Sequence, residues 1–294
     1  QGLKINSKDI GLNLDAILYT LPNVSAFVGS DIVAGVYLTE LKNKKDTLFI
    51  DIGTNGEIVL KAKDKLYCCS TAAGPALEGM NIECGMRAES GAIEAINLGK
   101  DEISLITIEN DAPLGICGSG LLSAVSQIVD NDLVNKRGRI IDPKKLEDTD
   151  YRKKYIRENK EGKRYIVLDE QNNVFLSQKD IRQVQLAKGA ILSGFITLLK
   201  RENMELTDLN SVIIAGGFGS HLKKEDITGV GILPKEVENL ISYVGNSSLI
   251  GAYIALMNDE IKNQMQDLSS QIEYIDLSTS ENYDKTFARS MQFN

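Results

Sequence analysis

Short apolar runs alternate with segments of helical periodicity along this chain, and that alternation restricts it to folds that pack helices against a sheet. A long helix is predicted at 180–201, where apolar residues recur every three or four positions and Ser177 forms a capping box with Asp180. The spacing also predicts helices at 32–41, 121–133 and 247–257, and strands at 24–29, 47–52, 57–61, 103–108, 164–168, 211–215 and 272–277. The predicted fold class is α/β with some antiparallel hairpins.

The stretch 135–161 departs from this pattern, because it holds clusters of Lys, Arg, Asp and Pro and few large apolar side chains. It is predicted to be a surface excursion. The segment 170–173 is predicted to be the turn of a hairpin that joins strands at 164–168 and 174–176, so the excursion extends to about residue 176.

The charge balance argues against nucleic acid as a partner. The chain has 33 Lys and Arg residues against 41 Asp and Glu residues, which gives a formal net charge of −8, and the basic residues are dispersed except around Lys153 and Lys154. No apolar run reaches the length of about 18 residues that a membrane span needs. The first residues, from Gln1, do not resemble a signal peptide, and the chain is expected to be a fragment.

The cysteines show no metal-ligand spacing, because C-x-x-C is absent and the chain has one histidine, His221. A zinc or iron–sulfur centre built within this chain is therefore not expected. Most of the cysteines are predicted to be compact buried hydrophobic residues, and reduced thiols together with an acidic composition favour a cytoplasmic location. The four are Cys68, Cys69, Cys84 and Cys117.

The segment 51–56 consists of an acid and a tight polar turn between two apolar strands. Phosphate can approach backbone N–H groups closely where Cβ atoms are absent, so Gly53 and Gly56 would clear space while Thr54 and Asn55 donate hydrogen bonds. Asp51 suits Mg²⁺ held through water. An ordinary Asn-Gly hairpin turn explains the same letters equally well.

The segment 215–219 is the end of a second buried strand, and it breaks into glycines. In α/β sheets ligands bind beyond the carboxyl ends of strands, where paired glycines let a flat ring or a sugar lie against the backbone. The candidate binding residues are Gly216, Gly217, Phe218 and Gly219. A simple strand-to-helix turn remains the competing explanation.

Two further segments place glycines and small polar residues where helices are predicted to begin. Gly245 and Asn246 precede one helix, and Gly118 and Ser119 open another. Helix N-termini attract anions. Neither the dinucleotide fingerprint G-x-G-x-x-G nor the P-loop G-x-x-x-x-G-K-[ST] occurs in the chain, so the usual Rossmann and P-loop interpretations fail.

Glu78 follows a Gly-Pro turn at the end of the segment 70–79. Its carboxylate could orient an attacking water. A carboxylate that is simply favoured at the start of a helix is the alternative interpretation.

Taken in order, a D-x-G-T hairpin, a late strand ending in Gly-Gly and a terminal Gly-Asn helix resemble the acetate kinase, sugar kinase, Hsp70 and actin superfamily of ATPases (ASKHA), whose core is ribonuclease H-like. Longer strings resemble the reductive activators of corrinoid proteins. These strings extend over 26–35, 51–59, 70–79, 115–121, 185–190 and 215–220.

The resemblance implies a protein that uses ATP and Mg²⁺ to drive an electron onto a cob(II) corrinoid protein and return it to the cob(I) state needed for methyl transfer. It implies that 51–56 is the second phosphate loop, that 216–219 contacts adenosine, and that Gly245 with Asn246 opens the second connecting helix. Asp51 and Glu78 are the candidate catalytic residues, and the excursion at 135–161 is a candidate contact with the corrinoid protein.

The family resembled here carries parts that this chain lacks. These are an N-terminal [2Fe–2S] ferredoxin domain with C-x₄-C-x₂-C spacing, through which electrons enter, and an earlier D-x-G-T-T phosphate loop. Residues 1–294 are therefore expected to be the C-terminal portion of the ATPase domain and to supply part of its cleft, with a homodimer as one way to complete it. A small-molecule kinase of the same superfamily and a non-catalytic, nucleotide-regulated interaction module are the alternatives.

Overall fold

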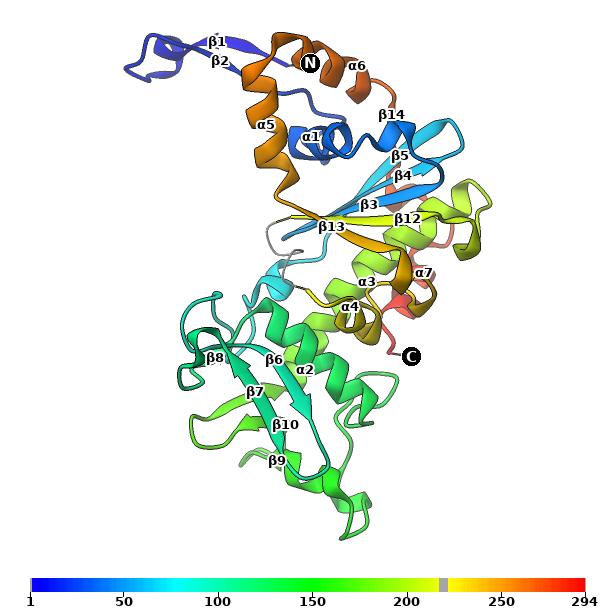
Figure 1. The fold of residues 1–294 in the computed structure, drawn as a ribbon. Helices are drawn as coiled ribbons and strands as arrows, with labels where there is room; N and C mark the ends of the chain where they lie inside the picture. Colours follow the sequence, from blue (N-terminus) through cyan, green and yellow to red (C-terminus); the bar gives the residue numbers. More distant parts are fainter. Residues whose placement is uncertain (1, 217–221, 294) are drawn as a thin grey trace.

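The computed structural model describes residues 2–216 and 222–293, and its centre is a six-stranded mixed sheet (Figure 1). The strand order is β13-β12-β3-β4-β5-β14. Strands β3, β4 and β5 form an antiparallel meander, whereas β12 runs parallel to both β3 and β13 and β14 runs parallel to β5. The bounds are Thr47–Ile52 for β3, Gly56–Ala62 for β4, Lys65–Thr71 for β5, Ser211–Ala215 for β12, Ile241–Gly245 for β13 and Ile272–Tyr274 for β14.

Helices cover both faces of this sheet (Figure 1). Helices α1 (Ser30–Leu38), α5 (Ser247–Met257) and α6 (Asp259–Ser269) lie on one side, and α3 (Gln178–Arg201) and α7 (Tyr283–Ser290) lie on the other. Within β3, Phe49 packs with the cluster around α1 and Ile50 packs with the cluster around α3. Burial on both faces explains why the central strands are nearly continuous apolar runs in the sequence.

A second group of elements extends from the sheet and contains two small three-stranded sheets (Figure 1). One has the order β7-β6-β8, with α2 packed on β6 and α4 packed on α2, and the other has the order β11-β10-β9. The bounds are Ala92–Leu98 for β6, Ile103–Thr107 for β7, Gly115–Ile116 for β8, Gly118–Asp130 for α2, Ile156–Glu158 for β9, Arg164–Asp169 for β10, Val174–Ser177 for β11 and Lys224–Val230 for α4.

Residues 2–20 form an arm that projects beside α5 and α6 (Figure 1). Strands β1 (Lys4–Asn6) and β2 (Ile17–Tyr19) pair in the arm, and Gly2 N donates to Gln266 Oε1 of α6 at 2.9 Å. Several apolar side chains of the arm are exposed, among them Leu3, Leu12, Leu14 and Ile17.

The predicted strand at 24–29 is wrong. Val24 N and Ser25 N both donate to Val28 O, and Ser25 Oγ accepts from the backbone of Phe27 and Val28. The serine side chain therefore satisfies the backbone locally, which competes with strand pairing. The strand predicted at 272–277 is shorter than expected, because Asp276 caps a separate 3-10 turn at Leu277–Thr279.

The interpretation of 135–161 as a surface excursion with little core is also wrong in part. Ile140, Tyr155 and Ile156 are buried in the main apolar cluster, and Ile156 begins β9, which pairs with β10. The predicted hairpin with its turn at 170–173 is confirmed by the pairing of β10 with β11. Helices predicted at 32–41 and 121–133 are present but begin and end two or three residues earlier, as α1 and α2.

The string at 185–190 holds the C-terminal end of the chain. Lys188 is 1% exposed, and its Nζ donates to Ser290 O at 2.8 Å and Gln292 O at 2.6 Å, while Gln185 Nε2 donates to Met291 O at 2.9 Å. Burial lowers the pKa of Lys188 to about 8, which leaves the ammonium mostly protonated at neutral pH. A cation beside the last carbonyls of α7 also opposes the negative end of the helix dipole.

Lys188→Met is expected to lower the free energy of unfolding by about 1–3 kcal/mol, because it removes charged donors from carbonyls near the end of α7. Lys200→Met changes an exposed lysine on the same helix and should leave stability within about 0.5 kcal/mol of the wild type. Chemical denaturation measures both variants. Equal denaturation midpoints for Lys188→Met and Lys200→Met would show that Lys188 does not anchor the C-terminal carbonyls.

Candidate functional site

Three of the predicted binding segments meet at one edge of the central sheet. Strand β12 lies between β3 and β13 and runs parallel to both, and its Ala215 is in register with Asp51 on one side and Gly245 on the other. Gly216 N donates to Gly245 O at 3.0 Å. The carboxyl ends of these parallel strands thus bring Asp51, Gly216 and Gly245 together, where ligands bind in open α/β sheets.

Gly216 faces the Asp51 carboxylate without a side chain between them. Its φ is +99°, and a Cβ at this position would lie 2.7 Å from Asp51 Oδ1 and 3.2 Å from Ile52 O. Residue 216 is therefore restricted to glycine by its backbone conformation and by its neighbours. The predicted residues Gly217, Phe218 and Gly219 lie outside the described residues.

The loop between β3 and β4 is a compact turn over residues 53–55, in which Gly53 N donates to Asn55 O at 3.0 Å. Neither Asn55 nor Gly56 has positive φ, so the loop is not the Asn-Gly hairpin turn considered as the alternative. A Cβ on Gly56 would lie 2.7 Å from Thr71 Oγ1, whereas a Cβ on Gly53 would meet nothing closer than 3.7 Å. Gly56 is needed for packing, and Gly53 leaves open space at the tip.

Glu78 lies at this same loop. Thr54 Oγ1 donates to Glu78 Oε1 at 2.8 Å, which links the β3–β4 loop to the one-turn 3-10 helix Pro75–Glu78. Gly74 and Gly79, with φ of +75° and +79°, bound that short helix. The position of Glu78 is thus set by a contact with the candidate phosphate loop.

Carboxylates concentrate around Asp51. Burial, and secondarily the charge of Asp31, raise the pKa of Asp51 to about 6. Glu57 is directly opposite Asp51 on β4, and burial followed by the charge of Asp31 raises its pKa to about 7, although a hydrogen bond from Ser70 Oγ at 3.3 Å acts in the other direction. No lysine or arginine pairs with Asp31, Asp51 or Glu57 among the described residues.

Such a site favours a cation. Among the described residues no group of three or more His, Cys, Asp or Glu side chains could hold a metal ion, so Asp51 would bind one as a single protein ligand. Mg²⁺ keeps several waters and is usually held by one or two carboxylates together with substrate phosphates. The donor set therefore fits Mg²⁺ bound through water with a nucleotide.

The raised pKa values predict a pH dependence of stability in the absence of nucleotide. Between the unfolded pKa near 4 and the folded values of about 6 and 7, the folded protein binds more protons, so stability should fall as pH rises through this range. Glu57→Gln should remove about 1–2 kcal/mol of that fall, after allowance for solvent screening. Thermal unfolding at pH 5 and pH 8 measures it, and an identical pH slope in wild type and variant would contradict the assignment.

The N-terminus of α2 lies next to the helix that carries Glu78. A Cβ on Gly79 would lie 3.4 Å from Ile116 O, one residue before the N-cap Cys117, and Ser119 Oγ lies 3.3 Å from Cys117 Sγ. Gly120 has a packing role, because a Cβ there would lie 2.0 Å from Ile93 O. Gly118 and Ser119 are thus at a helix start, as predicted from the sequence, and the structure places that start next to the short helix of Glu78.

Asn246 and Gly245 differ in the contacts that their positions make. Asn246 Oδ1 accepts from Leu249 N at 3.0 Å and from Ser248 Oγ at 2.9 Å, so its side chain caps α5. Gly245 has φ of +65°, and nothing lies within 4 Å of the position of its Cβ. The cap explains Asn246 structurally, whereas Gly245 has open space where a side chain would begin.

The cysteines take no part in this site. The predicted burial is confirmed for Cys68, Cys69 and Cys117, whereas Cys84 is partly exposed, and all four are free. Burial raises the pKa of the Cys68 thiol to about 12.

None of the described helices has the length and apolarity that crossing a membrane requires.

Two acidic residues of the site were missed by sequence reasoning. Asp31 lies in the first turn of α1, and Glu57 follows the phosphate loop. Both lie within strings that resemble the corrinoid activators. The signal for Glu57 was present: a three-residue loop after Asp51 and Ile52 places residue 57 opposite residue 51. Asp31 carried no such signal, because its proximity depends on how α1 packs on the sheet.

Comparisons with known proteins give mutually consistent matches. A family model described as "C-terminal domain of RACo the ASKHA domain" matches residues 45–294, and one described as "RACo middle region" matches residues 1–44. A solved structure of a "Reductive activator for corrinoid,iron-sulfur protein" is 35% identical, has a TM-score of 0.86, and covers 99% of this chain and 47% of that chain.

Two curated relatives bear related descriptions. The corrinoid activation enzyme RamQ of Eubacterium limosum is 33% identical over 296 residues, covering 99% of this chain and 50% of that protein. The [Co(II) methylated amine-specific corrinoid protein] reductase of Methanosarcina barkeri is 22% identical over 297 residues, covering 92% of this chain and 51% of that protein. The chain spans about half the length of both relatives.

Proposed function

This chain belongs to the family of C-terminal ASKHA domains of RACo, and from that premise we propose that it forms one wall of the ATP-binding cleft of a protein that reductively activates a corrinoid protein. The observation that carries the proposal is the meeting of Asp51, Gly216 and Gly245 at the carboxyl ends of three neighbouring strands. The relatives, described as a corrinoid activation enzyme and a corrinoid protein reductase, support the reaction class.

In this proposal each residue has a role set by its position. Asp51 holds Mg²⁺ through water, and Gly53, Thr54, Asn55 and Gly56 form the loop that receives the phosphates. The open space beside Gly245 leaves room for the nucleoside, and the missing side chain at Gly216 leaves room for the Asp51 carboxylate. ATP and Mg²⁺, when bound, supply the negative phosphates and the counter-ion that neutralise one another at this edge.

Glu78 is the candidate residue for orienting an attacking water. Its hydrogen bond with Thr54 keeps the carboxylate at the phosphate loop without placing it next to Asp51. Helix α2 begins beside it with Gly118 and Ser119, so a change at the loop would reach α2 through Glu78 and Gly79. Nucleotide can favour an activating conformation only by binding it more tightly than the alternative.

The other wall of the cleft comes, in this proposal, from a part of the protein outside residues 1–294, and residues 1–44 match the family model described as "RACo middle region". The exposed face of α5 supports this, because five apolar side chains lie along it at helical spacing beside the projecting arm. They are Leu249, Ile250, Tyr253, Leu256 and Met257. A second copy of the chain is the competing cover, and the molar mass of the full-length protein by light scattering separates the two.

Electrons would enter through a ferredoxin-type [2Fe–2S] domain outside this chain, as the resemblance implies. The chain itself would then contribute nucleotide binding and docking of the corrinoid protein. Reduction from cob(II) to cob(I) adds one electron to the cobalt and forms no covalent bond to this chain.

The proposal is tested in the full-length protein by measuring phosphate release and the absorbance change of the corrinoid together. We expect ATP-dependent conversion of cob(II) to cob(I) when a low-potential reductant is present, and phosphate release that the corrinoid protein stimulates. Phosphate transfer to a small acceptor, with no effect of the corrinoid protein, would instead establish a small-molecule kinase.

A further inference from the structure

The segment 135–164 is the most basic part of an acidic chain. It holds twelve of the 33 Lys and Arg residues and six of the 41 Asp and Glu residues, so its net charge is +6 in a chain whose net charge is −8. The segment begins just after α2 and continues through β9 to the start of β10. The sequence analysis marked the region around Lys153 and Lys154 as the exception to dispersed basic residues, and the excess of positive charge extends over the whole segment.

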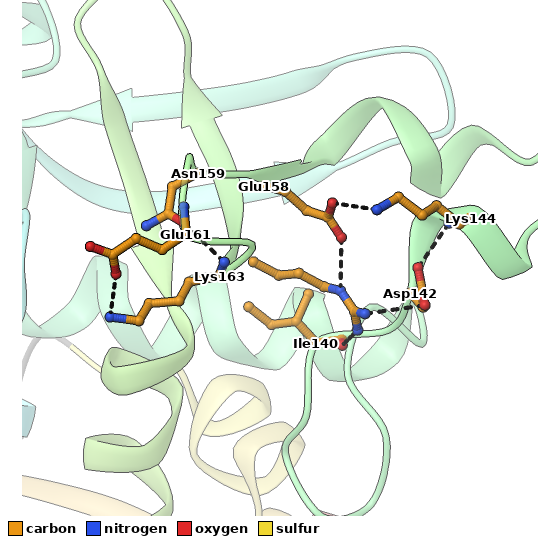
Figure 2. Close-up of polar contacts among 8 residues, drawn as sticks. Ile140, Asp142, Lys144, Glu158, Asn159, Glu161 and Lys163 are labelled. Carbon is orange, nitrogen blue, oxygen red and sulfur yellow. Dashed lines mark hydrogen bonds and ion pairs between the residues drawn. The ribbon is translucent and has the colours of Figure 1, made fainter.

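The acidic residues of the segment are largely neutralised by its own basic residues. Lys144 Nζ lies 2.7 Å from Glu158, and Arg164 lies 3.4 Å from Glu158 and 3.2 Å from Asp142. Figure 2 shows Lys144, Glu158 and Asp142 in this chain of ion pairs. Asp148, Asp150 and Glu161 are paired in the same way with Lys153, Arg152 and Lys163, each at 2.7 Å.

Seven cations are left over after this internal pairing. Of these, Arg157 pairs with Glu170 beyond the segment, and Lys154 is half-buried and donates to the Lys100 carbonyl. The remaining five share two properties. They are exposed, and within the part of the chain that the structure describes none of them forms an ion pair. The five are Lys136, Arg137, Arg139, Lys145 and Lys160. Unpaired charges of one sign on one surface attract an oppositely charged partner over about 8–10 Å at physiological ionic strength.

A cavity lies within this basic segment. A cavity of about 370 Å³ is lined by Arg139, Lys145, Arg152 and Arg164 together with apolar Ile141 and Leu146. Arg164 is held in place by its two carboxylates and donates to Ile140 O at 3.0 Å, and Arg152 is held by Asp150. Asp142 also lines the cavity and is neutralised by Arg164. The two unpaired cations, Arg139 and Lys145, suit the carboxylate of an inserted Asp or Glu side chain.

We infer that residues 135–164 form a docking surface for an acidic protein face, and that the occupant is the corrinoid protein. The inference rests on the proposed function, which requires this protein to hold a corrinoid partner. Nucleic acid fits less well, because the rest of the chain is strongly acidic and the cavity wall is partly apolar. Helix α2 links the surface to the nucleotide site, since its N-terminus lies beside Glu78 and its C-terminus leads into residue 135.

The test compares two double charge reversals in the full-length protein. Arg139→Glu/Lys145→Glu changes the cavity, and Lys44→Glu/Lys285→Glu makes the same change of net charge at exposed lysines elsewhere. The dissociation constant for the cob(II) corrinoid protein is measured by calorimetry at about 50 and 300 mM NaCl. We expect the first variant to bind about tenfold more weakly at low salt with a reduced salt dependence, and the control to stay within about twofold.

Each result decides the inference. If wild type binds the corrinoid protein and the Arg139→Glu/Lys145→Glu variant binds it equally well, the surface assignment fails while the proposed function stands. If wild type binds no corrinoid protein at either salt concentration, both fail. Displacement of the corrinoid protein by a short DNA duplex of equal affinity would overturn the choice of occupant.

Two readouts guard against misfolding. Basal ATP hydrolysis should be unchanged in both variants, because neither pair lies at the nucleotide site, and the thermal midpoints should match wild type. Should the first variant fold poorly, Lys136→Glu/Arg137→Glu tests the same surface with side chains that line no cavity and make no ion pair in the described structure. Full affinity of that folded variant would contradict the inference.

Discussion

Asp51→Asn in the full-length protein is expected to lower the rate of ATP hydrolysis by at least about 100-fold, the loss typical when a charge that stabilises a phosphoryl transition state is removed. The amide keeps the size of the carboxylate but cannot hold Mg²⁺ as an anion. Asp51 is the acidic group at the end of β3 that faces Gly216, so no neighbouring strand-end residue replaces it. Phosphate release under saturating ATP is the measurement.

The same variant should not lose stability without nucleotide. Burial and Asp31 raise the pKa of Asp51 to about 6, which means that the ionised carboxylate is disfavoured in the folded protein at neutral pH. An uncharged amide removes that penalty. Thermal unfolding of Asp51→Asn should therefore give a midpoint equal to or above that of wild type at pH 8.

Asp64→Asn is a matched control, because it makes the same change at an exposed position between β4 and β5. It should leave both hydrolysis and stability as they are. If Asp51→Asn hydrolyses ATP at the wild-type rate, 51–56 is not a phosphate loop. If both variants lose activity together, the effect belongs to net charge and not to the site.

The sequence predicted the elements that bury a continuous apolar stripe. The strand at 211–215 and the helix at 247–257 agree with β12 and α5 at both ends, because a buried strand and a helix bounded by Asn246 have clear local signals. The contribution of the segment 135–161 to the core was not predicted, because it comes from isolated residues such as Ile140 and Tyr155. Their burial depends on where β10 and α2 place the main cluster.

Some contacts of the candidate site could likewise be predicted from the sequence and others could not. That Asp51 and Gly216 would be neighbours could be expected once both were placed at the carboxyl ends of parallel strands. The contact of Thr54 with Glu78 and the influence of Asp31 on Asp51 could not, because each joins elements whose relative positions are set by packing. The basic surface could be recognised from the composition. Its cavity could not be predicted, because the ion pairs that position Arg164 in the cavity wall depend on the fold.

Gly216→Ala is expected to weaken ATP binding by about two orders of magnitude, which corresponds to about 2.7 kcal/mol. The new methyl group would lie 2.7 Å from Asp51 Oδ1, so either the carboxylate or the backbone after β12 must move. The φ of +99° adds strain for any side chain. Because both changes fall where the proposal places Mg²⁺ and the nucleoside, they should reduce affinity as well as stability. Calorimetric titration with ATP in the full-length protein measures the effect.

Gly162→Ala separates the two causes. Gly162 also has positive φ, +75°, but no atom lies within 4 Å of the position of its Cβ, and it belongs to the turn between β9 and β10. It should therefore share the backbone strain, at a cost of about 1 kcal/mol, and leave ATP affinity unchanged. If Gly216→Ala loses only as much stability as Gly162→Ala and binds ATP normally, then Gly216 is a turn residue and the end of β12 is not part of the cleft. If affinity falls in Gly216→Ala alone, the loss must come from the space that Asp51 and Gly216 share.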